Sequence, residues 1–146
     1  MDCKLIYFLT LLSLGFIVNM SLLRCDFRDP KFKIYYVEGQ RLYNQYCSNC
    51  HSITGNGLGQ LYPPLIKSDY MAANINKVFC LMKYGISDSI KVNGVVYNRT
   101  MFGVPSLTEL EIAEIATYIY NSWGNEKGYV DVSTVSKAMK DCNAKN

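Results

Sequence analysis

Histidine is almost absent from this chain, whose 146 residues include a single one, His51. One histidine excludes zinc sites of the Cys₂His₂ type and makes catalysis by several histidines impossible. The net charge is only +3 and no cluster of basic residues is visible, so the electrostatic footprint of a nucleic-acid-binding protein is missing. Four prolines and ten glycines are too few for collagen-like or low-complexity structure.

The chain does contain enough apolar material for one folded domain. Hydrophobic residues make up 49% of the sequence and charged residues 18%, a balance typical of a chain that buries a core. A length of 146 residues indicates one small domain with appendages.

The N-terminal region is typical of an exported protein. Lys4 precedes an uncharged apolar run, Leu5 to Val18, which has the build of the apolar part of a signal peptide. Extended to Leu23, the run is just long enough to span a bilayer. We therefore expect residues 1–24 to be a signal peptide or a membrane anchor, and residues 25–35 to be a polar tether.

Cys25 directly follows this apolar region, as the lipid-modified cysteine does in bacterial lipoproteins. The residue before it, Arg24, departs from that pattern, because glycine, alanine or serine normally stands there. A lipid on Cys25, an uncleaved helical anchor and a cleaved soluble form all remain open. Each of them predicts export.

The strongest motif is the run Cys47-Ser48-Asn49-Cys50-His51. C-x-x-C-H is the covalent attachment motif of c-type haem. Two thiols on one helical turn reach the two vinyl groups at one edge of a porphyrin, and the adjoining imidazole then lies beneath the iron as its proximal ligand. A thioredoxin-like C-x-x-C would need a preceding strand and a βαβ pattern, and neither is visible. A disulfide between Cys47 and Cys50 would leave His51 unexplained.

Around this motif the chain resembles the single-haem class I cytochrome c domains, especially the membrane-tethered bacterial kind. The resemblance covers roughly Val37 to Asn125, and its motifs occur in the family's order: Gly39 to Tyr43, the attachment motif, Tyr62 to Leu65, Val92-Asn93-Gly94 with Tyr97-Asn98, Met101, and Tyr118 to Asn125. It implies an all-α class I cytochrome c fold of about four to five helices around one haem, with a small β-hairpin before the loop of the methionine ligand. We expect this domain over residues 36–125 and a C-terminal extension over residues 126–146.

The resemblance also implies a binding site. It places one covalent haem c per chain on Cys47, Cys50 and His51. Pro63 would accept a hydrogen bond from the imidazole Nδ1–H through its carbonyl, and Met101 would be the sixth ligand. Because the chain has no second histidine, a methionine thioether is the strong donor left for that position, and core packing on a helix explains Met82 better.

These features predict a one-electron carrier rather than an enzyme, either alone or as a subunit of a redox complex. His/Met ligation fills the iron's coordination sphere and raises the haem's reduction potential, so electron transfer would be outer-sphere. The expected partner is a redox protein such as a terminal oxidase, a reductase or a dehydrogenase, on the periplasmic side of a bacterial membrane. Membrane contact would come from the N-terminal segment or a lipid on Cys25, and no nucleic acid is expected.

Two alternatives from other classes stay open. If Met101 is displaced from the iron, the chain would be an open-site haem protein, a peroxidase or a gas sensor. Without haem, Cys47 and Cys50 would make it a thiol oxidoreductase.

Local patterns predict several elements of the domain. Apolar spacing predicts a short helix over residues 36–46, in which Gly39 would cost stability unless another part of the chain packs closely there. The family resemblance implies a crossing with the last helix of the domain at this point, where a residue such as Tyr118 lies against the bare backbone. Two β-prone runs around Asn93-Gly94 predict a hairpin over residues 90–97 with a type I′ turn.

The C-terminal half carries clear helix signals. Residues 108–111 form a capping box that predicts a helix start, and Gly124 predicts its end. We expect Glu109, Glu111 and Glu114 to face solvent in the first turns. We expect a final short helix over residues 133–141.

Cys80 and Cys142 are not assigned by any motif. In an oxidising compartment, a disulfide between them would hold the C-terminal tail on the domain. Free buried thiols and a bond from Cys142 to an unmodified Cys25 remain open, because the sequence does not show which Cα atoms are close enough for a disulfide.

Overall fold

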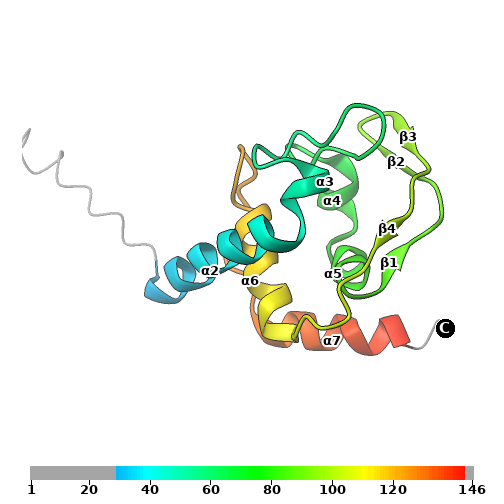
Figure 1. Ribbon diagram of the computed structural model, residues 1–146. Helices are drawn as coiled ribbons and strands as arrows, with labels where there is room; N and C mark the ends of the chain where they lie inside the picture. The colour runs from blue at the N-terminus through cyan, green and yellow to red at the C-terminus, as the bar shows by residue number, and fades with distance from the viewer. Residues whose placement is uncertain (1–28, 144–146) are drawn as a thin grey trace, which may run out of the picture.

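Helices build most of the domain in this computed structural model, which describes residues 29–143 (Figure 1). The helices are α2 (Pro30–Tyr46), α3 (Ser48–His51), α4 (Asp69–Ala73), α5 (Ile75–Tyr84), α6 (Glu109–Ile119) and α7 (Val132–Asn143). The strands are β1 (Gly85–Ile86), β2 (Ile90–Val92), β3 (Val95–Tyr97) and β4 (Met101–Phe102). The prediction of a mostly helical domain with a small hairpin is confirmed.

The signal peptide or anchor predicted over residues 1–24 and the lipid site predicted at Cys25 lie outside the described residues. Within residues 29–143, none of the helices has the length and apolar character needed to cross a bilayer.

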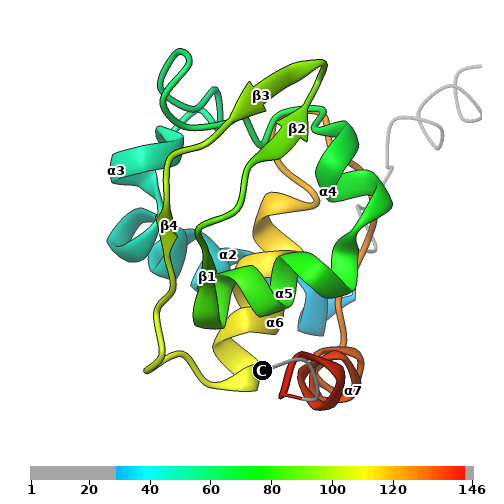
Figure 2. The same cartoon turned by 90° about the vertical axis from the view of Figure 1, so that its right-hand side faces the viewer.

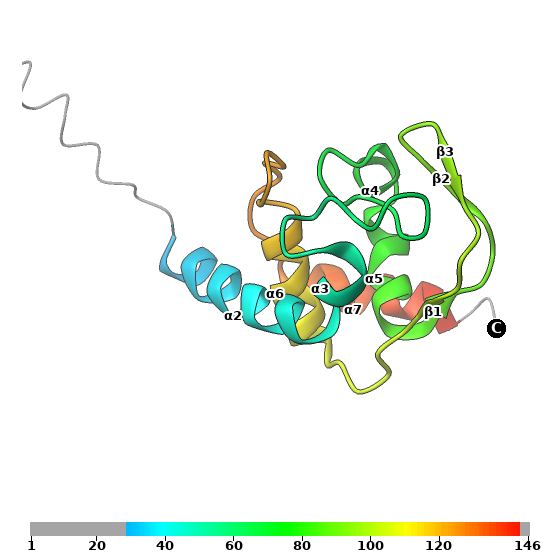
Figure 3. The same ribbon diagram turned by 45° about the horizontal axis from the view of Figure 1, so that its top comes forward.

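Helix α2 begins at Pro30, earlier than the predicted start at residue 36, so the second half of the predicted polar tether is helical. Two local features explain the early start: the Asp29 carboxylate accepts a hydrogen bond from the Lys31 amide at 2.9 Å, and a proline occupies the first helical position. Tyr35 then packs edge-on against Tyr129, with ring centroids 4.8 Å apart, which ties these first turns to the C-terminal part of the domain. The first turns of α2 lie at one end of the domain and the β2–β3 hairpin at the other (Figure 3).

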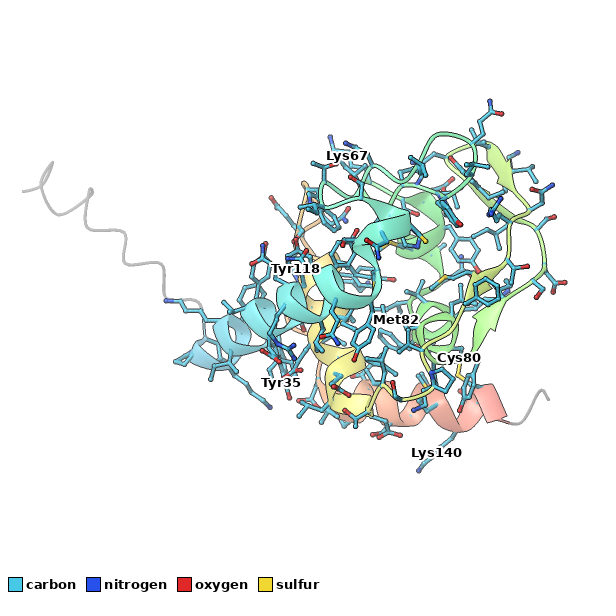
Figure 4. All side chains as sticks on the ribbon, in the orientation of Figure 1. Tyr35, Lys67, Cys80, Met82, Tyr118 and Lys140 are labelled. Carbon is cyan, nitrogen blue, oxygen red and sulfur yellow. A yellow bond between two sulfur atoms is a disulfide. The ribbon has the colours of Figure 1, made fainter. Side chains whose placement is uncertain are left out.

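The central contact of the fold is the crossing of α2 over α6. A Cβ atom added to Gly39 would lie 2.0 Å from the carbonyl oxygen of Glu114 and 3.0 Å from the Cβ of Tyr118, so only glycine fits there. The expected crossing at Tyr118 is therefore confirmed (Figure 4). The solvent-facing position predicted for Glu114 is wrong: α2 covers that face of α6, and the residue is only 7% exposed. Burial raises the pKa of its carboxyl group.

Helix α6 starts as predicted and ends earlier than predicted. Thr108 and Glu111 form the capping box, with the Glu111 amide donating to Oγ1 of Thr108 at 3.2 Å and the Thr108 amide donating to the Glu111 carboxylate at 2.7 Å. The helix ends at Ile119 and not near Gly124. The side-chain amide of Asn125 donates to the carbonyls of Ile119 at 2.9 Å and Leu65 at 3.1 Å, which binds the loop after the helix back onto the domain.

Two small antiparallel sheets lie on one side of the domain (Figure 2). Strands β2 and β3 form the predicted hairpin, and Asn93 and Gly94 take positive φ values of 49° and 84°, as a type I′ turn requires. The pairing of β1 with β4 was not predicted. It sets Ile86 opposite Met101 and so holds Met101 next to the end of α5.

The C-terminal helix predicted over residues 133–141 is confirmed as α7, and it packs on α5 and α6. Val135, Ala138 and Met139 are buried in the same core cluster as the interior of α6, so the predicted extension shares the core of the domain. Cys80 of α5 and Cys142 of α7 form a disulfide with Cα atoms 5.8 Å apart, which decides between the alternatives left open by the sequence.

Loss of this disulfide should destabilise the domain. The two cysteines are 62 residues apart, and closing a loop of that length stabilises a fold by about 4 kcal/mol through the unfolded chain. We expect the double variant Cys80→Ser/Cys142→Ser to show that loss in urea unfolding. Lys140→Ala, an exposed change on the same helix, should alter the free energy of unfolding by less than about 0.5 kcal/mol. Alkylation of both thiols without reductant would contradict the assignment.

Candidate functional site

One helical turn brings the residues of the C-x-x-C-H motif together. Cys47 ends α2 and precedes α3, and its carbonyl accepts hydrogen bonds from the amides of Cys50 at 3.2 Å and His51 at 3.0 Å. Both cysteine thiols are free and partly buried. The local helical geometry therefore presents two thiols and one imidazole from the same short segment.

His51 is held in the orientation and protonation state of a metal ligand. The side chain is only 8% exposed, and its Nδ1 lies 3.0 Å from the carbonyl oxygen of Pro63. Because a carbonyl only accepts, Nδ1 carries the proton and Nε2 keeps its lone pair. Burial lowers the pKa of His51, and the bond to Pro63 opposes this in part. The imidazole is therefore neutral near pH 7.

The loop between His51 and Pro63 depends on a glycine. Gly57 has a positive φ of 69°, and a Cβ there would lie 2.3 Å from the carbonyl oxygen of Tyr62 and 2.7 Å from that of Pro63. The Gly57 amide also donates to the carbonyl of His51 at 3.0 Å. This close packing keeps the Pro63 carbonyl against the imidazole.

A cavity of about 260 Å³ opens beside α3 and continues into an apolar recess of about 70 Å³. Both parts are lined by one shared set of residues: Cys47, His51, Pro63, Met82, Ile90 and Met101. Cys50 lines the larger part. The structure thus brings every predicted site residue to one cavity.

Two methionines line this cavity, from different elements. Met101 belongs to β4. Just after this strand, Gly103 packs so closely on Gly85 that a Cβ atom added to Gly103 would lie 2.5 Å from the backbone nitrogen of Gly85. This close approach fixes the position of β4. Met82 belongs to α5 (Figure 4). Its side chain is 6% exposed. Core packing was predicted for Met82 from its helical spacing, and the structure shows that this core face also borders the cavity.

Polar and aromatic residues that were not predicted to belong to the site complete the cavity wall. At the mouth, Nε of Arg99 donates to the hydroxyl of Tyr62 at 3.1 Å, and its guanidinium carbon lies 5.6 Å from the centroid of that ring. Phe102 lies at the same mouth and is 85% exposed. Tyr70 lines the apolar recess. Tyr62 belongs to one of the motifs of the resemblance, but only the tertiary structure shows that it and the other three residues line the cavity.

The environment of Cys47 disfavours thiol redox chemistry. Burial raises the pKa of this thiol to about 12, with a smaller contribution from Cys50. A thiol oxidoreductase needs the opposite, a lowered pKa that supplies thiolate as the nucleophile. A neutral thiol beside an apolar recess instead suits a cysteine whose sulfur becomes bonded to a hydrophobic ligand as a thioether.

The donor set fits a c-type haem. Two thiols on one turn match the two vinyl groups of the porphyrin edge, and a neutral imidazole with a free Nε2 matches an axial iron ligand. Met101 and aliphatic side chains line the same cavity, and walls of this kind suit a flat hydrophobic ring.

Comparison with known families agrees with this geometry: the family model described as cytochrome c matches residues 36–123. The chain belongs to the cytochrome c family. Proteins of this family bind haem covalently and act in haem-based electron transfer. The matched segment of this cytochrome contains the attachment motif, Pro63 and Met101, whereas α7 lies beyond it. A search of curated proteins finds no match to the chain.

Proposed function

We propose that this cytochrome is a class I, single-haem carrier of one electron at a time, with His51 and Met101 as the axial ligands of its iron. The observation that carries the proposal is the shared cavity, into which a buried neutral imidazole and a methionine thioether both open. The haem supplies reversible one-electron chemistry when bound. The chain supplies attachment, ligands and a defined environment.

Each residue of the site has a distinct part in that environment. Cys47 and Cys50 would hold the haem through thioether bonds, and the carbonyl of Pro63 orients the imidazole ring of His51 by its hydrogen bond to Nδ1. Met101 would supply the second iron ligand and raise the reduction potential, and the aliphatic walls would favour the less charged reduced state. With side chains as both ligands, the site would leave small molecules no place on the iron and would support outer-sphere electron transfer.

We further propose that this carrier works outside the cytoplasm, on the periplasmic side of a bacterial membrane. The apolar run before residue 24 supports export, followed by cleavage or anchoring, and Cys25 supports a lipid anchor. The disulfide between Cys80 and Cys142 also favours an oxidising compartment. A redox protein such as a terminal oxidase, a reductase or a dehydrogenase would exchange electrons with it.

The test is an absorption spectrum of the full chain, matured in a host that assembles c-type haem. We expect an alkaline pyridine spectrum of the c type, together with the long-wavelength ferric band of methionine-to-iron charge transfer. Covalent haem without that band would favour the open-site alternative. A protein without haem would overturn the proposal.

A further inference from the structure

One tyrosine in the cavity wall has a buried hydroxyl group without a partner. Among residues 29–143, the hydroxyl of Tyr70 is the buried side-chain nitrogen or oxygen for which no hydrogen bond is found. Two core tyrosines show the usual pairing: Tyr43 donates to the carbonyl of Ser52 at 2.6 Å, and Tyr120 donates to that of Met71 at 2.8 Å. A buried polar group is normally paired, so this hydroxyl calls for a partner that the chain does not supply.

The position of Tyr70 is held from several sides. The Met71 amide donates to the hydroxyl of Ser68 at 3.2 Å and so begins α4. Asp69 and Asn93 bind each other reciprocally, since the Asn93 amide donates to the carboxylate at 2.7 Å and the Asp69 amide donates to the Asn93 side chain at 3.0 Å. This pair clamps α4 to the hairpin, so the ring of Tyr70 is kept in the cavity wall.

None of the described residues around this hydroxyl forms a hydrogen bond with it. The recess that Tyr70 lines is otherwise walled mainly by aliphatic side chains, among them Leu65, Val92 and Ile115. The same recess reaches Cys47 and His51. Figure 2 shows α3 and α4 on opposite sides of the domain interior, with the hairpin and α5 between them. A ligand attached at α3 that fills this space therefore presents its far edge toward α4.

Haem has its polar atoms at the required edge. Its thioether bonds form at one edge of the porphyrin, and its two propionate carboxylates project from the opposite edge, while the rest of the periphery is hydrocarbon. We propose that the hydroxyl of Tyr70 donates a hydrogen bond to a propionate carboxylate of the bound haem. This inference rests on the proposed function, and it makes Tyr70 a positioning residue for the cofactor.

The hydrogen bond has a consequence for the reduction potential. A carboxylate near the iron stabilises the ferric state, which carries one more positive charge than the ferrous state. A donor to that carboxylate withdraws part of its negative charge and so favours reduction. Removing the donor should therefore lower the potential without disturbing either axial ligand.

The test compares two holoproteins, Tyr70→Phe and the control Tyr120→Phe, with the wild-type chain. Phenylalanine keeps the ring volume, and Tyr70→Phe breaks no protein hydrogen bond, so we expect it to fold. We expect Tyr70→Phe to shift the propionate bending band in the resonance Raman spectrum and to reduce the equilibrium constant for reduction several-fold. Tyr120→Phe, which loses a bond within the protein, should lower stability and leave the Raman band in place.

Each other result has a definite meaning. A Tyr70→Phe protein with the wild-type band and potential would overturn the inference while leaving covalent haem and its methionine band intact. Loss of a tyrosine-to-iron charge-transfer band would show that Tyr70 binds the iron, which also overturns it. Absence of covalent haem from the wild-type chain would instead refute the proposed function and the inference with it.

Discussion

Replacement of both Cys47 and Cys50 by serine should abolish covalent haem attachment. Serine hydroxyls do not add to the vinyl groups, and these two cysteines are the free thiols among the residues that the structure describes. After denaturation, the wild-type chain should retain the mass of one haem and stain for haem on a gel. The double variant should have only the mass of the polypeptide.

The chain provides a matched control for this experiment. Cys80→Ser/Cys142→Ser removes the same number of sulfur atoms, yet its cysteines bridge α5 and α7 rather than line the cavity. This variant should keep the covalent haem and lose stability instead. Haem that survives denaturation in Cys47→Ser/Cys50→Ser would refute the assignment of the attachment site.

Replacement of Met101 by alanine should have the second large effect, on the iron itself. Loss of the thioether removes a weak donor that stabilises the ferrous state, and the position becomes open to water. We expect the long-wavelength ferric band to disappear, the ferrous form to bind carbon monoxide, and the reduction potential to fall by on the order of 100 mV. Absorption spectra of the ferric form and of the ferrous form under carbon monoxide measure the first two effects, and optical titration against redox dyes measures the potential.

Met82 provides the control, because it lines the same cavity from α5. Met82→Leu nearly conserves side-chain volume, so it should cost less than about 1.5 kcal/mol of stability and keep the ferric band. If Met82→Leu lost the band and Met101→Ala kept it, the sixth ligand would be Met82.

The prediction from sequence succeeded where a few neighbouring residues determine the geometry. The C-x-x-C-H run places two thiols and an imidazole on one turn because helical spacing alone requires it. Asn93 and Gly94 form a type I′ turn because few other residues tolerate positive φ at both positions. The side chains of Thr108 and Glu111 each accept a hydrogen bond from the backbone amide of the other residue. The start of α6 therefore also depends only on residues close together in the sequence.

Two predictions failed at positions that contacts with other parts of the chain determine, namely the exposure of Glu114 and the end of α6. Glu114 was expected in solvent because the acidic residues at the start of α6 suit an exposed helix end, but α2 covers that position through the close approach at Gly39. Helix α6 ends at Ile119 because the side chain of Asn125 binds the carbonyls of Ile119 and of the distant Leu65. The early start of α2 is a different case, since its signals at Asp29 and Pro30 are local and the packing of Tyr35 on Tyr129 adds to them.

The sequence by itself determined the covalent attachment motif, the family and the order of most helices, since these depend on residue types at short spacing. Only the tertiary structure decided the pairing of Cys80 with Cys142, the nearness of Met82 and Met101, and the inward position of the Tyr70 hydroxyl. These features require helices and strands distant in sequence to pack in one particular arrangement. That arrangement is set by which faces cover one another, through contacts such as Gly39 on Glu114 and Gly103 on Gly85, and no local pattern encodes it.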